Sequence, residues 1–227
     1  MASLREIICI HGVSERRDAT GFSSALRVEV ERQARKHGLG SRARWTEVVW
    51  SDLSDLAASG GLANALDMAM DVVRYERDAA LRQSVGETLR GSLLARPGSV
   101  LVAHSLGSVV ALDVLLGGGV EVSSLITLGS PLGISGAGID FLERAPRASS
   151  ALEGIDWLDI YSPQDPVHTG ALGSLQAVVG ARGLEGSGYP CRSVSIDLGA
   201  NPIQAHTGYW RQPLVARWVL AAASRSS

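Results

Sequence analysis

Residues 99–116 read SVLVAHSLGSVVALDVLL and join two apolar segments through a short turn. The first segment, Ser99–Ala103, carries a continuous apolar run, which is typical of a strand buried on both faces of a sheet. The second segment, Leu106–Leu116, is apolar on nearly every side, which predicts a buried helix that the glycines at 117–119 end. The sequence therefore predicts a strand, a tight turn and a buried helix in succession.

The same alternation of short apolar runs and helical patterns extends along the chain. It favours an α/β fold with a mostly parallel sheet of about six strands and helices on both faces. Residues 1–227 are expected to form one domain, with lid-like glycine-rich loops near 130–150 and 168–190. Gly86 is a candidate for a bend in the longest helix. The expected strands are Glu6–Ile10, Trp45–Trp50, Ser99–Ala103, Ser124–Leu128, Asp156–Tyr161 and Ser193–Leu198, and the expected helices are Phe22–His37, Leu62–Leu94, Leu106–Leu116 and Tyr209–Ala223.

Composition narrows the class of protein further. The 227 residues are 45% hydrophobic and 19% charged, which indicates a globular chain, and the net charge of −2 argues against nucleic-acid binding. The N-terminal apolar run is too short for a signal peptide, and Leu214–Ala223 is too short for an integral membrane segment. We therefore expect a soluble, cytoplasmic protein. Cys9 and Cys191 each lie in or beside an apolar run, which predicts two buried free thiols.

The turn at residues 103–107 has the sequence AHSLG. A serine between a strand and a helix lies on a sharp turn that lifts its hydroxyl above the sheet edge, and small residues two positions before and after it allow close approach. Ala103 and Gly107 meet this requirement. The N-terminus of the helix would place the Leu106 N–H beside the hydroxyl, where it could stabilise an oxyanion. Ser105 is therefore a candidate nucleophile; the alternative is a serine that only caps the helix.

A second signal, His11-Gly12-Val13, directly follows the first predicted strand. A turn there would let the Val13 N–H point into the site and form an oxyanion hole with the Leu106 N–H. The alternative is an ordinary turn at the end of a strand, with His11 bonded to nearby backbone. The first interpretation gains weight because Ser105 follows another strand of the same predicted sheet.

A nucleophilic serine needs a general base, and His206 is the strongest candidate. It falls in a predicted loop between the last strand and the last helix, where the chain order serine, acid, histidine places the base. His168, also in a loop after a strand, is the substitute. His37 ends a polar helix and is expected to be solvated, whereas the side chain of His104 is expected to diverge from that of its neighbour Ser105.

The base in turn needs a carboxylate that orients it, and Asp165 is the main candidate. It lies just past the predicted strand Asp156–Tyr161, from where it can reach a histidine on the next loop. The flanking prolines also allow a plain turn. Asp159, within the strand, and Asp140, in the preceding loop, are the alternatives.

Metal and cofactor sites are not expected. The histidines lack cysteine or paired-carboxylate partners at ligand spacing. No glycine-rich stretch combines the strand–loop–helix setting with the lysine of a nucleotide cradle. The sequence therefore predicts neither a metal ion nor a redox or nucleotide cofactor.

Five segments in order along the chain resemble the α/β-hydrolase superfamily, especially compact bacterial lipase-like, esterase-like and GPI-inositol-deacylase-like serine hydrolases. They are IHGV (10–13), AHSLG (103–107), LGSPLG (128–133), DPV (165–167), and His206 with Tyr209-Trp210. The chain departs from the family pattern in three ways: Ala103 replaces a usual glycine, only a short region at 129–150 replaces the large cap, and the first two strands are missing.

The resemblance implies that Ser105 is the nucleophile, His206 the general base and Asp165 its partner. It also implies an oxyanion hole formed by the Val13 and Leu106 N–H groups. The supporting residues are His11, Gly12, His104 and Gly107.

The expected reaction is hydrolysis of a carboxylic ester or thioester through an acyl-serine intermediate. The expected substrate is a small-molecule or lipid-like acyl compound. One alternative is an acyltransferase or cyclising thioesterase that uses the same triad. Another is a hydrolase fold that binds without catalysis.

Overall fold

The computed structural model describes residues 4–12, 20–39, 43–50, 73–132, 149–168 and 191–225. Within these ranges six strands form one sheet in the order β2-β1-β3-β4-β5-β6, and every neighbouring pair is parallel. The sheet confirms the expected α/β fold class, and the observed ends of five strands lie within two residues of the predicted ones. The strands are β1 (Ile7–Ile10), β2 (Trp45–Val48), β3 (Ser99–His104), β4 (Val122–Leu128), β5 (Asp156–Tyr161) and β6 (Cys191–Ser195).

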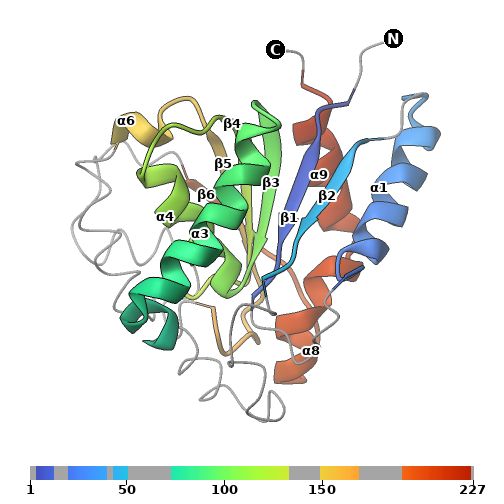
Figure 1. Ribbon diagram of the computed structural model, residues 1–227. Coiled ribbons are helices and arrows are strands. Elements are labelled where there is room, and N and C mark those ends of the chain that lie inside the picture. The colour runs from blue at the N-terminus through green and yellow to red at the C-terminus, as the bar shows by residue number, and fades with distance from the viewer. Residues whose placement is uncertain are drawn as a thin grey trace.

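Helices cover both faces of the sheet (Figure 1). α3 (Ala79–Leu94) and α4 (Leu106–Leu116) lie on one face, and α1 (Ser24–Lys36) and α9 (Pro213–Ala223) lie on the other. No helix in the described part of the chain is long and apolar enough to cross a membrane.

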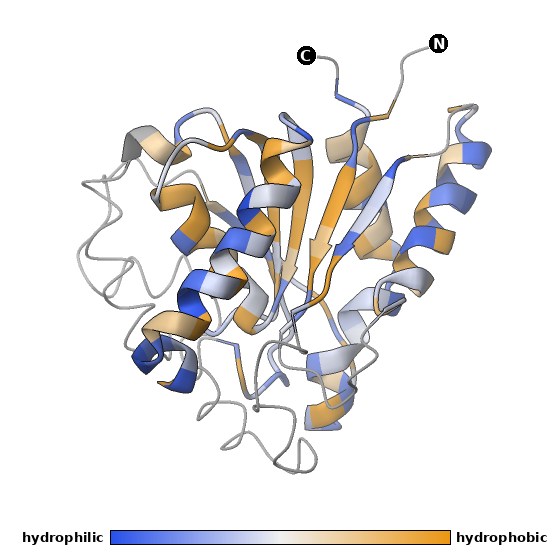
Figure 2. Cartoon of the chain, viewed as in Figure 1, coloured by the Kyte–Doolittle hydropathy of each residue, from blue (hydrophilic) through white to orange (hydrophobic). Residues whose placement is uncertain are grey.

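Alternate residues of the central strands supply the two hydrophobic cores. On β1, Ile8 and Ile10 pack into the core beneath α3 and α4, whereas Ile7 and Cys9 pack into the core beneath α1 and α9. A strand with a helix layer on each side must be apolar at successive positions, which explains the uninterrupted runs in the sequence. Figure 2 shows this distribution, with hydrophobic strands inside and hydrophilic residues on the outer faces of α1 and α3. Cys9 and Cys191 are buried free thiols, as predicted.

The predicted helix Leu62–Leu94 is confirmed in its described part except for a break at Asp78. Residues 73–77 are helical, but α3 starts afresh after Asp78, whose carboxylate accepts a hydrogen bond from the Leu81 N–H at 2.9 Å. An aspartate in this role stabilises a helix start, so the break falls at Asp78. Gly86, the expected bend, lies inside α3. Residues 62–72 are outside the described ranges.

The C-terminal region also differs from the prediction. His206 lies in the short helix α8 (Pro202–Thr207) rather than in a loop, and the 3₁₀ helix η5 (Gly208–Arg211) precedes α9. Because Pro213 begins α9 and cannot continue a preceding helix, the expected single helix Tyr209–Ala223 is divided. A second short helix, α6 (Ser149–Leu152), lies where a loop was expected. The two expected lid-like loops fall almost wholly outside the described residues.

Candidate active site

The predicted site residues follow different strands but lie at one edge of the sheet. His11 and Gly12 follow β1, Ser105 follows β3, Asp165 comes after β5, and His206 comes after β6. The carboxyl ends of parallel strands meet at the same edge, where open α/β sheets form their sites. The topology therefore gathers residues up to 195 positions apart.

Ser105 lies on a strained turn between β3 and α4. Its φ is 53° and its ψ is −131°, and it is the one non-glycine residue with positive φ in the described ranges. Such a conformation costs about 1–3 kcal/mol and persists only where the surroundings impose it. Here the Ser105 N–H donates to the Leu128 carbonyl at 2.9 Å, and the Ser108 N–H donates to the Ser105 carbonyl at 2.9 Å. The side chain makes no capping hydrogen bond to α4, so the capping alternative does not describe this serine.

The side chains of Ser105, His206 and Asp165 form a continuous hydrogen-bonded row. His206 Nε2 lies 3.0 Å from Ser105 Oγ, and His206 Nδ1 lies 2.9 Å and 3.0 Å from the two oxygens of Asp165. A carboxylate only accepts hydrogen bonds, so Nδ1 carries the proton and Nε2 is left to accept the serine hydroxyl. All three side chains are buried. The arrangement can transfer a proton from the hydroxyl to the imidazole.

Asp165 is held as a carboxylate by three donors among the described residues. Oδ1 accepts from His206 and from the Val167 N–H at 2.9 Å, while Oδ2 accepts from the Tyr209 hydroxyl at 2.8 Å. Burial raises the pKa of Asp165, but the hydrogen bonds and charge of His206, with those of Val167 and Tyr209, outweigh it and leave the pKa below its ordinary value. The Tyr209 hydroxyl in turn accepts the Ser162 N–H at 2.9 Å. Burial raises the pKa of Tyr209, so its phenol remains a donor.

Gly12 lies directly against Ser105, the candidate nucleophile. A Cβ at this position would be 2.7 Å from Ser105 Cβ, 3.0 Å from Ser105 Oγ and 3.2 Å from the Leu106 nitrogen. The absence of a side chain therefore leaves space beside both the hydroxyl and the first N–H of α4. Val13, the other expected oxyanion donor, lies outside the described residues.

Gly107 and His11 bring the turn after β1 into close contact with the turn between β3 and α4. A Cβ on Gly107 would be 2.7 Å from the His11 carbonyl oxygen, and that oxygen accepts a 2.9 Å hydrogen bond from Trp50 Nε1. The His11 ring is stacked on Trp50 with ring centroids 5.7 Å apart, and its Nδ1 is bonded to the Gly12 carbonyl. Burial lowers the pKa of His11 to about 4, so the ring is neutral at pH 7. His11 thus supports the turn through its ring and its carbonyl.

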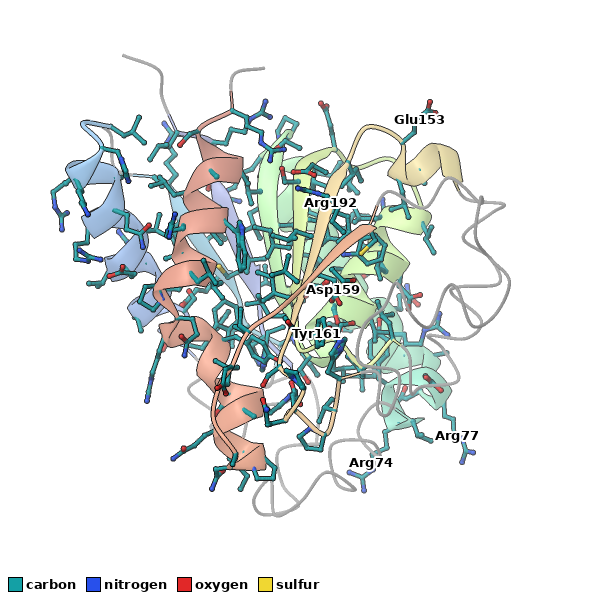
Figure 3. The ribbon with its side chains drawn as sticks, turned by 180° about the vertical axis from the view of Figure 1, so that it is seen from behind. Arg74, Arg77, Glu153, Asp159, Tyr161 and Arg192 are labelled. Atoms are coloured by element: carbon teal, nitrogen blue, oxygen red, sulfur yellow. The ribbon has the colours of Figure 1, made fainter. Side chains whose placement is uncertain are left out.

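The alternative site residues occupy other positions. His168 Nδ1 is 3.3 Å from the Ser130 carbonyl, and its Nε2 is 3.9 Å from Asp159, whereas the imidazole bonded to Ser105 is that of His206. Asp159 lies in β5, as predicted, and accepts a hydrogen bond from Thr127 at 2.7 Å. Figure 3 labels Asp159 and Tyr161 along β5, of which Asp159 is buried and Tyr161 is half-buried. His37 is exposed at the end of α1, as expected, and Asp140 lies outside the described residues.

Sequence reasoning missed two residues that shape the site. Tyr209 was noted only as part of a family motif, although its hydroxyl bonds Asp165. Gly129 has a φ of 53°, and a Cβ there would be 2.6 Å from Asp165 Oδ2 and 2.8 Å from Tyr209 Cε2. A glycine directly after a strand was the available signal. The ring of His104, which was expected to diverge from the Ser105 side chain, lies 4.8 Å from that of His206.

Solved structures resemble this chain in fold, whereas the comparisons of its sequence with known families and curated proteins find no match. A Xanthomonas campestris protein described as an alpha/beta-superfamily hydrolase is 19% identical, with a TM-score of 0.52 over 96% of this chain and 99% of its own. A pyrethroid hydrolase from Sphingobium faniae is 16% identical, with a TM-score of 0.52 over 97% and 98%. The chain has the α/β-hydrolase fold.

A third solved structure with this fold is S-formylglutathione hydrolase from Staphylococcus aureus, at 13% identity and a TM-score of 0.51 over 96% of this chain and 82% of that one. Identities this low show the α/β-hydrolase fold alone and leave chemistry to the site. Among the described residues, no group of three or more His, Cys, Asp or Glu side chains could hold a metal ion.

Proposed function

We propose that the protein is a serine hydrolase that cleaves a carboxylic ester or thioester through an acyl-Ser105 intermediate. The observation that carries the proposal is the row of 3.0 Å and 2.9 Å contacts from Ser105 through His206 to Asp165. The fold supports it further, because the structures named above are hydrolases.

In the first half-reaction Ser105 Oγ attacks the acyl carbonyl while His206 Nε2 takes the hydroxyl proton. The carbonyl oxygen becomes an oxyanion, and the N–H groups of Leu106 and Val13 are the donors we propose for it. His206 then gives its proton to the departing alkoxide or thiolate. Asp165 stabilises the imidazolium that exists between these two transfers.

In the second half-reaction water replaces the alcohol or thiol. His206 removes a proton from water, the hydroxide attacks the acyl-Ser105 carbonyl, and the proton returns to Ser105 Oγ as the acid leaves. The absence of a side chain at Gly12 leaves room beside Ser105 Oγ for the reacting carbonyl. Small-molecule or lipid-like acyl compounds are the substrate class that we propose.

Hydrolysis of p-nitrophenyl esters and matching thioesters of increasing acyl length tests the proposal. We expect the wild type to release acid and Ser105→Ala to lose at least about 10³-fold in kcat/KM. Ser92→Ala, which removes a half-buried hydroxyl that donates only to the Thr88 carbonyl of the same helix among the described contacts, is the control for preparation and should match the wild type. Equal activity in wild type and Ser105→Ala would contradict the proposal, and transfer of the acyl group to an added alcohol in place of water would redirect it to acyl transfer.

A further inference from the structure

His104 is a buried imidazole that the proposed triad does not use. It is the last residue of β3 and directly precedes Ser105. Its Nε2 lies 2.7 Å from the backbone carbonyl oxygen of His206, 102 positions away. Because a carbonyl oxygen only accepts, Nε2 carries the proton of this hydrogen bond. The ring also lies 4.8 Å from the ring of His206, 5.8 Å from that of Tyr209 and 5.6 Å from that of Trp210.

The helix that carries His206 depends on such contacts for its position. α8 has six residues, of which only Ala205 and His206 are buried. A helix of this length is not stable by itself, so tertiary contacts must hold it. Its N-terminal capping bond, from the Gln204 N–H to Asn201, is local and exposed and does not attach the helix to the sheet. The hydrogen bond from His104 attaches the backbone of α8 to β3.

We infer that His104 is a positioning residue that holds His206 in place, an inference that rests on the proposed function. The base is then held at two points, its carbonyl by His104 and its Nδ1 by Asp165, which directs its Nε2 at Ser105. Since His104 and Ser105 are adjacent, the same peptide segment carries the nucleophile and fixes the base. A displacement of about 1 Å at such a contact costs about 10²-fold in rate.

A neutral imidazole suits this position better than a charged donor. Burial is the main cause that lowers the pKa of His104 to about 3, and the electrostatic effect of the neighbouring His206 is the second. The ring therefore donates through Nε2 without a positive charge at pH 7. An arginine or lysine would also donate to the carbonyl, but its charge would oppose the imidazolium that forms on His206 during the reaction.

Two substitutions separate the hydrogen bond from the bulk of the ring. His104→Gln keeps an N–H donor at similar reach, and His104→Phe keeps a ring but removes the donor. With turnover expressed per Ser105 labelled by a fluorophosphonate, we expect His104→Phe to lower kcat about 10- to 100-fold with KM within about threefold. His104→Gln should remain within about fivefold of wild type. His37→Phe, the same change at an exposed site, should alter neither constant.

Other outcomes overturn the inference. If His104 has only a structural role, His104→Phe will lower the melting temperature while kcat per labelled serine stays at the wild-type value. If Gln is as damaging to kcat as Phe, the hydrogen bond is not what matters. A wild type without Ser105-dependent hydrolysis would refute the proposed function, whereas an active wild type with an unaffected His104→Phe variant refutes the role of His104 alone.

A measurement on the wild type covers the case in which the Phe variant does not fold. In ¹⁵N-labelled protein at pH 7, we expect His104 to be neutral with its proton on Nε2, hydrogen-bonded to the carbonyl. A neutral ring with its proton on Nδ1 would overturn the inference without reference to any variant, because Nε2 could then not donate to the carbonyl.

Discussion

Asp165 shows how a few hydrogen bonds fix the state of one residue. Burial alone would favour its neutral acid, but donors from His206, Val167 and Tyr209 keep the pKa below the ordinary value. The contribution of Asp165 to stability is thus fully present above the ordinary carboxyl pKa and is lost only as the pH falls through the lower folded value. At neutral pH the residue is a carboxylate that fixes the tautomer of His206.

Tyr209→Phe tests this arrangement. The change removes a donor to Asp165 Oδ2 and leaves the buried Ser162 N–H without its acceptor. We expect the free energy of unfolding to fall by about 1–3 kcal/mol and kcat to fall with it. Urea unfolding and ester turnover measure the two effects. Tyr161→Phe, on β5, is the matched control, and equal stability of the two variants would contradict the role of the Tyr209 hydroxyl.

At the scale of elements, the site depends on two turns that touch. The turn after β1 and the turn between β3 and α4 approach so closely that Gly12 and Gly107 have no room for a side chain. At Gly12 the neighbours are Ser105 and Leu106, and at Gly107 they are backbone atoms of Ile10 and His11. Neither set can move cheaply, because each belongs to a buried strand or to the proposed nucleophile.

Gly12→Ala is therefore expected to displace Ser105 or to cover it. The new Cβ would lie 2.7 Å from Ser105 Cβ, so we expect ester turnover to fall by at least about 10²-fold. Gly91→Ala provides the control, because a Cβ there meets nothing within 4 Å and lies in α3. It should keep full activity and gain up to about 1 kcal/mol in stability. Normal turnover by Gly12→Ala would show that the two turns can separate.

The sequence predicted those elements that have a strong apolar pattern. α4 and β5 have the predicted bounds, because one is apolar on all sides and the other is a compact run between turns. α8 was missed, since two buried positions in six residues give no period. The break at Asp78, which caps the start of α3, was missed. An aspartate among regularly spaced apolar residues is equally typical of the exposed face of a continuous helix.

At the scale of the whole molecule, three histidines are buried in neutral form. Burial is the main cause that lowers the pKa of His11 to about 4, of His104 to about 3 and of His168 to about 4. Each contacts a segment distant in sequence: His104 reaches α8, His168 reaches the turn after β4, and the His11 ring stacks on Trp50. No local pattern contains these contacts, so the sequence predicted the three catalytic candidates, with His11 and His104 as supporting residues, but not the contacts that the buried histidines make.

Because these histidines are neutral in the folded chain, we expect its free energy of unfolding to fall in acid. In the unfolded chain these histidines take up protons near pH 6.5, whereas in the folded chain they do not. Their contribution to the free energy of unfolding is therefore fully present above that pH and falls as the pH drops toward 4. Each group contributes a slope of up to about 1.4 kcal/mol per pH unit. Urea unfolding between pH 7 and pH 5 measures it. The slope should be smaller in His104→Gln and unchanged in His37→Gln, and a flat profile would contradict the buried neutral state.

Mass spectrometry after treatment with a fluorophosphonate tests most directly whether Ser105 is an activated nucleophile. We expect one phosphonyl adduct per chain, located on Ser105 by peptide mapping, and no adduct in Ser105→Ala. In His206→Gln, where the 3.0 Å contact to the hydroxyl is lost, labelling should slow by at least about 10²-fold. An unlabelled wild type, an adduct on another residue, or undiminished labelling of His206→Gln would contradict the proposed triad.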